Sequence, residues 1–218
     1  MTQFRHDEFN PQKTETGAAA MQSRSAHVRH EIARIISSVI HPIIFPLFTI
    51  LIISYSRNND LKYSVVLMFI ALVVAALPLT ALVIFQVRRG HWTDLDVSQR
   101  TQRYFLYPFS IVSIIIVLII YAKLHASYAL LTLGAMFTAN VVNGFVNLKW
   151  KISAHATAAA SCATLLWLFT FVWGPLAAIA AILVSWSRVE LGRHTTGQVI
   201  AGSLVGLTSA LAIFEIFH

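Results

Sequence analysis

Charged residues are scarce in this chain. Asp, Glu, Lys and Arg make up 11% of its 218 residues, whereas a soluble domain carries roughly 25%. Hydrophobic residues account for 57%, and the mean hydropathy is +0.70. This balance excludes an ordinary soluble domain and indicates an integral membrane protein.

Cysteine and acidic residues are also rare. Cys162 is the single cysteine and lies in an apolar run, which excludes a disulfide framework and a cysteine metal site. Asp and Glu total 9, and no pair of carboxylates recurs at metal-ligand spacing inside the apolar runs, so we expect no metal and no other cofactor. The net charge of +7 comes from basic residues in short connections, which predicts lipid headgroups and phosphates as partners rather than nucleic acid.

The distribution of apolar residues predicts an all-α, polytopic helical bundle. Residues 1–25 are polar and are interpreted as a disordered tail, while residues 26–218 are predicted to form a single membrane-embedded domain. Because about 20 helical residues match the hydrocarbon thickness, we expect seven spans, the sixth of them short. These predicted spans are residues 35–55, 63–87, 105–121, 127–146, 154–172, 175–189 and 195–217.

The basic residues divide unevenly between the two sides of this bundle. With seven crossings, the N-terminal tail and the loops around 88–104, 147–153 and 190–194 lie on one side. Of the 16 Lys and Arg residues, only three fall on the other side: Arg57, Lys62 and Lys123. The positive-inside rule therefore predicts a cell inner or plasma membrane, with the N-terminus and these loops facing the cytoplasm.

Asparagines and prolines inside the predicted spans receive structural interpretations. Three asparagines fall on one face of the fourth span: Asn140, Asn143 and Asn147. Polar groups in a membrane need partners, so this stripe favours helix packing over substrate contact. The His41-Pro42 pair, Pro46 and Pro78 are interpreted as kinks.

The densest polar stretch after the tail, residues 187–198, lies between two apolar helices. Arg188 precedes His194 by a short loop, so a guanidinium can lie beside an imidazole and grip a phosphate through paired hydrogen bonds. Gln198 follows His194 by one helical turn and can meet the ring's other nitrogen. A basic loop that only touches headgroups is the alternative interpretation.

Two further polar clusters flank predicted spans. Ser153 is a predicted N-cap, and the free N–H groups behind it form an anion site beside Lys151 and His155. Arg100 and Arg103 are three residues apart and share a helix face. The alternative for His155 is a histidine that is only hydrogen-bonded at a helix end. The alternative for Arg100 and Arg103 is an anchor at the membrane interface. The count of spans puts all three clusters on one side of the membrane, which favours a single phosphate site.

Over residues 94–206 these clusters resemble the signatures of the type 2 phosphatidic acid phosphatase superfamily. Its third signature is matched by Ser187, Arg188 and His194, with Gln198 at the place of an aspartate. Its second signature is matched by Ser153 and His155.

The first signature is matched by Arg103, and here Asp96 occupies the place of a lysine. Arg100, Lys151 or Arg193 can supply the positive charge that is missing there.

The resemblance implies a six-helix core, to which this chain adds an N-terminal span, and a metal-independent lipid phosphatase. His194 would attack phosphorus to form a phosphohistidine that water hydrolyses, oriented by Gln198, and His155 would protonate the leaving group. The remaining residues would hold the phosphate: Arg188, Arg103, Arg100, Lys151, Ser153 and Ser187. The implied substrate is a lipid phosphomonoester or an isoprenyl diphosphate. A non-catalytic protein of the same fold that binds or transports a lipid phosphate is the alternative.

Overall fold

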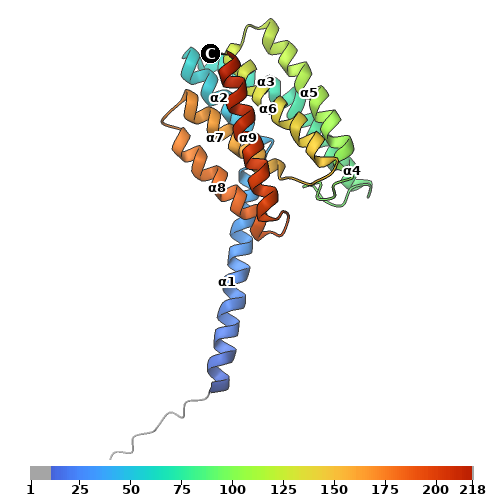
Figure 1. The fold of residues 1–218 in the computed structure, drawn as a ribbon, viewed down its shortest axis with the longest axis vertical. Helices are drawn as coiled ribbons and strands as arrows, with labels where there is room; N and C mark the ends of the chain where they lie inside the picture. The colour runs from blue at the N-terminus through green and yellow to red at the C-terminus, as the bar shows by residue number, and fades with distance from the viewer. Residues whose placement is uncertain (1–10, 218) are drawn as a thin grey trace, which may run out of the picture.

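All regular structure in the computed structural model, which describes residues 11–217, is helical. In chain order the elements are α1 (Pro11–Val39), α2 (Ile44–Asn58), α3 (Leu61–Ala71), the π-helix η1 (Leu72–Ala76), α4 (Leu77–Arg88), α5 (Arg103–Lys123), α6 (Ser127–Asn147), α7 (Ala154–Phe169), α8 (Gly174–Glu190) and α9 (Thr196–Phe217). Helices α2 to α9 pack as a bundle, and α1 projects from one end of it as a long stalk (Figure 1). The predicted all-α class is confirmed.

Four helices are long and apolar enough to cross a membrane by length and composition. They are Leu61–Arg88, Arg103–Lys123, Ser127–Asn147 and Thr196–Phe217. The pair Ser23–Val39 and Ile44–Asn58, bent by 51°, makes a fifth if it counts as one span. Helices α7 and α8 contain 16 and 17 residues and are shorter than the other candidates. The structure thus supports a polytopic membrane protein but only part of the seven-span prediction.

The N-terminal helix starts earlier than the sequence pattern predicts. Because α1 begins at Pro11, the prediction of a disordered tail is wrong for residues 11–25, and residues 1–10 lie outside the described residues. Residues 11–25 have no apolar stripe but contain the run Ala18-Ala19-Ala20-Met21-Gln22, whose residue types favour a helix intrinsically. A search for hydrophobic periodicity overlooks a helix of this kind.

The prolines act in three different ways. At His41-Pro42 the helical path breaks between α1 and α2, so the predicted kink is confirmed. Pro78 lies just after η1, where the Leu77 N–H bonds to the Leu72 carbonyl five residues back, so the structure has a π-bulge at this proline within the continuous helix Leu61–Arg88. The kink prediction is wrong for Pro46, which lies in the first turn of α2, where a helix needs no N–H donor.

The asparagine stripe of α6 bonds to neighbouring segments. Three hydrogen bonds do this: Asn140 Nδ2 to Ser110 Oγ at 2.6 Å, Thr157 Oγ1 to Asn143 Oδ1 at 3.3 Å, and Asn147 Nδ2 to the Arg100 carbonyl at 3.2 Å. These bonds join α6 to its neighbours, as the packing interpretation predicts, while Asn140 and Asn143 also line the cavity inside the bundle, so substrate contact stays the alternative for these two.

Helices α7 and α9 approach each other closely through two glycines. A Cβ on Gly202 would lie 2.7 Å from the Ser153 carbonyl oxygen, and one on Gly206 would overlap the Thr157 carbonyl oxygen. Ser161 Oγ also donates to the Gly206 carbonyl at 2.8 Å. Small residues allow backbones this close, and the contact places the start of α7 beside the start of α9.

Candidate functional site

The three polar clusters meet at one end of the bundle, near its junction with α1 (Figure 1). Three hydrogen bonds join them: Arg103 Nη1 to the Ile152 carbonyl at 3.1 Å, Lys151 Nζ to the Arg193 carbonyl at 2.9 Å, and the Ser153 N–H to the Gln198 carbonyl at 3.2 Å. The predicted convergence of these segments is confirmed.

His194 lies between α8 and α9 with 6% of its surface exposed. Its Nδ1 lies 3.2 Å from Gln198 Oε1, so the predicted contact is confirmed. The same oxygen accepts the Thr195 backbone N–H at 3.2 Å. Since an amide oxygen can only accept, Nδ1 carries the ring proton, and Nε2 keeps a lone pair for chemistry.

The surroundings of His194 keep its ring neutral. Burial lowers its pKa to about 3, and the positive charges of Lys151, Arg103 and Arg188 act in the same direction. The pKa of Lys151 is itself lowered, first by burial and then by the charge of Arg103. A neutral imidazole within a group of cations can attack an electrophile that carries negative charge.

Arg188 is deeply buried in the site, with 1% of its surface exposed. Both of its Nη atoms donate to Asp96 Oδ2 at 3.1 Å, and Nη1 also donates to Ser37 Oγ at 2.7 Å. Its Nε has no partner among the described residues. Asp96, which stands where the resemblance implies a lysine, is therefore the counterion of the arginine predicted to bind phosphate.

Arg103 and Arg100 hold neighbouring loops. Arg103 is buried, and its Nε donates to the Val97 carbonyl at 2.8 Å, in addition to its bond with Ile152. Arg100 Nη1 donates to the Leu148 carbonyl at 2.6 Å, and its guanidinium lies over the Tyr104 ring. Arg103 thus belongs to the group around His194, whereas Arg100 contacts the end of α6, the residue after it and the start of α5. The prediction that the two arginines share a helix face is wrong, because α5 begins at Arg103 and Arg100 lies in the turn before it.

The two serines of the predicted site differ in what they offer. Ser153 is the N-cap of α7, as predicted, and its Oγ accepts the Ala156 N–H at 3.3 Å. Ser187 is fully buried and donates to the Val184 carbonyl of its own helix at 2.7 Å. Its hydroxyl proton is thereby used inside α8, whereas the resemblance implies that Ser187 contacts the phosphate.

His155, His41 and Asp96 form a compact group that the sequence analysis does not foresee. Their ligand atoms all lie within 4.8 Å of one another, and the rings of His41 and His155 meet edge to face with centroids 5.3 Å apart. His155 is buried, and its Nε2 has no partner among the described residues. The signal available in the sequence was the presence of His41 in an apolar run, since a polar residue there calls for a partner.

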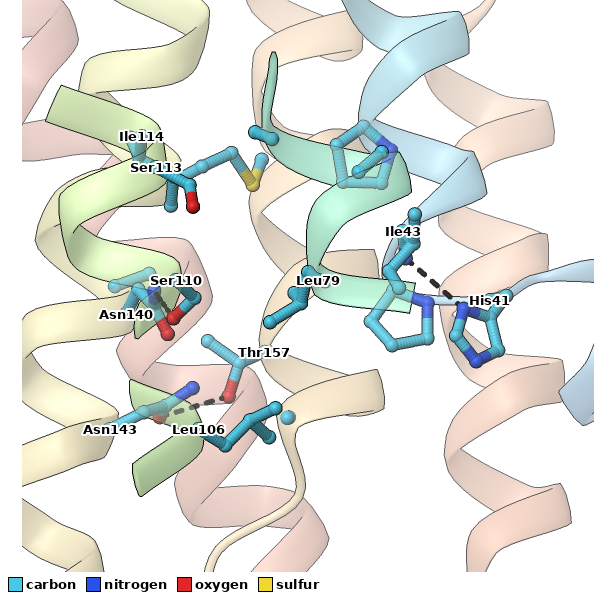
Figure 2. A pocket seen from close by; sticks show the side chains of 18 of the residues that line it. His41, Ile43, Leu79, Leu106, Ser110, Ser113, Ile114, Asn140, Asn143 and Thr157 are labelled. Atoms are coloured by element: carbon cyan, nitrogen blue, oxygen red, sulfur yellow. Dashed lines mark hydrogen bonds between the residues drawn. The ribbon is translucent and has the colours of Figure 1, made fainter. Parts of the chain in front are cut away.

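Two hollows meet at His41 and Asp96, which line both. One is an apolar cavity of about 230 Å³ inside the bundle, which Arg103 and His155 also line; Figure 2 shows Leu79, Leu106 and Ile114 on its walls. The other is a polar hollow of about 280 Å³ between α1 and the 191–193 loop, lined by His30 and by the cations Arg34 and Arg193. A molecule with an apolar and an anionic part would find a matching environment on each side of this junction.

Comparison of the chain with protein-family models, with curated proteins and with solved structures finds no match.

Proposed function

We propose that this chain is a membrane phosphatase that hydrolyses a lipid phosphomonoester or an isoprenyl diphosphate through a phosphohistidine on His194. The observation that carries the proposal is the neutral, oriented imidazole of His194 among buried cations. A cationic group of this kind stabilises the charge of the phosphoryl transition state in a site shielded from water.

The reaction uses two steps at phosphorus. His194 Nε2 forms the N–P bond at the terminal phosphorus while the P–O bond to the leaving group, a lipid alcohol or a lipid monophosphate, breaks, and His155 gives a proton to the departing oxygen. Water then attacks phosphorus, the N–P bond breaks, and His155 takes the proton that water loses. The charges of Arg188 and Arg103 oppose protonation of His155, so the first step needs the negative charge of a bound phosphate to offset them.

The equatorial phosphate oxygens would be held by Arg188, Arg103 and Lys151, with the N–H groups behind Ser153 assisting. Arg188 must first exchange the Asp96 carboxylate for phosphate, or share it. Arg193, whose Nε lies 3.8 Å from Asp96 Oδ2, can take over that carboxylate.

The apolar cavity supports a lipid as substrate. It reaches from the site into the bundle, so a hydrocarbon chain can lie among its walls while the phosphate stays near His41 and Asp96. Apolar surface transferred there from water contributes about 25 cal/mol per Å² to binding. In this proposal all seven predicted spans cross an inner or plasma membrane around a six-helix core, and the site faces the cytoplasm.

A non-catalytic protein that binds or transports a lipid phosphate is the second candidate. The Arg188–Asp96 ion pair favours it, because a carboxylate already occupies the arginine that the phosphatase must use. Binding alone needs no nucleophile, so phosphate binding would survive replacement of His194.

Phosphate release tests the proposal directly. Purified, detergent-solubilised protein would be assayed with phosphatidate, phosphatidylglycerophosphate and farnesyl or longer prenyl diphosphates, with and without EDTA. We expect release from at least one substrate, retention in EDTA, and loss of at least about 100-fold in His194→Ala. His27→Ala, an exposed histidine of α1, is the matched control. Full activity in His194→Ala, or no phosphate release from any of these substrates, would contradict the proposal.

A further inference from the structure

We propose that His41, Asp96 and His155 form a binding site for a divalent transition-metal ion such as Zn²⁺. The site joins the break between α1 and α2, the 90–102 loop and the start of α7. It lies at the junction of the two hollows, so an ion can reach it through the polar one.

The two histidines offer nitrogens that the protein leaves available. His155 Nε2 is buried without a partner among the described residues, which is costly for a polar atom unless something fills that place. His41 Nδ1 accepts the Ile43 N–H at 3.3 Å, as Figure 2 shows, so its Nε2 is the nitrogen free of that bond. Metal binding at Nε2 moves the ring proton to Nδ1, and the bond from the Ile43 N–H is then lost. The loss is small because this bond, at 3.3 Å, is longer than the usual 2.9–3.0 Å.

The Asp96 carboxylate offers one oxygen to an ion. Its Oδ2 accepts from Arg188, while Oδ1 has no hydrogen bond within the described part of the chain. An arginine that holds the far oxygen of a ligating carboxylate fixes its orientation, as outer groups around metal sites do.

The donor set selects the kind of ion. Two imidazole nitrogens and one carboxylate oxygen suit Zn²⁺, Co²⁺ or Fe²⁺, whereas Mg²⁺ and Ca²⁺ take oxygen ligands. The nearby charges of Arg188 and Arg193 oppose any cation. Mg²⁺ and Ca²⁺ are disfavoured most, because the single carboxylate of Asp96 is the ligand that attracts them.

The consequence of such an ion for activity rests on the proposed function. His155 Nε2 cannot hold a metal ion and also transfer the proton of the leaving group. A bound ion would therefore inhibit phosphate release, and removal of the ion would restore it. Ion binding itself does not depend on whether the chain is a phosphatase.

Metal content and the visible spectrum of Co²⁺ test the site without an activity assay. Full-length protein without a histidine tag would be stripped with a chelator, loaded with Zn²⁺ or Co²⁺ in detergent, desalted and measured. We expect about one ion per chain, and Co²⁺ absorption bands of a site with nitrogen and oxygen ligands. His41→Ala and Asp96→Asn should each lose at least about 90% of the bound ion, whereas His194→Ala and His27→Ala should keep it.

Two outcomes would overturn the site: no stoichiometric ion in the native protein, or equal ion content in His41→Ala and the native protein. Asp96→Asn, which keeps the side-chain volume, serves if His41→Ala does not fold. Stoichiometric uptake of Mg²⁺ or Ca²⁺ would also contradict the choice of ion. Stripped protein that releases no phosphate but still binds Zn²⁺ would count against the phosphatase alone.

Discussion

Arg188 and Asp96 form an ion pair in which both Nη atoms of the arginine donate to one carboxylate oxygen at 3.1 Å. The arginine is buried, and the aspartate comes from a loop 92 residues earlier in the chain. The face of the guanidinium that a phosphate would use is thus covered by an anion of the protein itself.

Replacing this anion should strengthen oxyanion binding. We expect Asp96→Asn to bind inorganic phosphate or vanadate at least about tenfold more tightly, because the neutral amide no longer competes for Arg188. Titration calorimetry of the chelator-stripped protein measures the affinity. Asp94→Asn is the matched control, since Asp94 lies 4.0 Å from Arg193 in the same loop but does not pair with Arg188. Unchanged affinity in Asp96→Asn would show that the pair does not guard the site.

The orientation of His194 by Gln198 should control the formation of the covalent intermediate. Gln198→Leu removes the oxygen that fixes the ring proton on Nδ1, so we expect phosphohistidine formation to slow by at least about tenfold. Rapid-quench trapping with a radiolabelled substrate measures that step. Gln198→Glu keeps an acceptor in reach and should retain the rate. A normal rate in Gln198→Leu would disprove the orienting role.

Acid should destabilise the native protein partly through His194. The unfolded ring titrates near 6.5 and the folded ring near 3, so between these values the unfolded chain binds the extra proton. The stability that depends on the neutral ring is complete above pH 6.5 and is lost as the pH falls towards 3. From pH 7 to 5, the native melting temperature should fall by roughly 5 °C more than that of His194→Gln. Parallel curves for the two proteins would contradict the lowered pKa.

The close contact of α7 and α9 should tolerate no added methyl group. Gly206→Ala would place a Cβ against the Thr157 backbone, where neither side can yield, so we expect a loss of about 1–3 kcal/mol or failure to fold. Thermal unfolding in detergent measures the loss. Gly134→Ala is the control in α6, because its Cβ would lie 3.7 Å from Ile213, an ordinary contact. Equal stability of the two variants would show that the helices can move apart.

The sequence predicted the meeting of the three clusters because each lies beside an apolar run. His194, His155 and Arg188 could be placed at one end of the bundle from the order of the runs and the polar loops between them. The Gln198 contact also followed from the four-residue spacing, although His194 precedes α9, and Gln198 holds this turn through reciprocal bonds with Thr195 at the helix start.

The contacts that the sequence did not predict join distant segments. The ion pair of Asp96 with Arg188 joins residues 92 positions apart, and the ring contact of His41 with His155 joins the break between α1 and α2 to the start of α7, so no spacing within one segment encodes either contact. The bond that Ser187 makes within its own helix was not predicted for a different reason. A hydroxyl near the end of a helix can bond back to its own carbonyls, and that local choice leaves no mark in a motif.

The bond from Arg188 to Ser37 spans 151 residues and bears on how the protein is made. A ribosome releases α1 and the 90–102 loop long before α8 emerges. Until then Asp96 is without the arginine that balances its charge. The buried charges can pair only when α8 arrives, so the last stage of synthesis completes both the site and the electrostatic balance of the bundle.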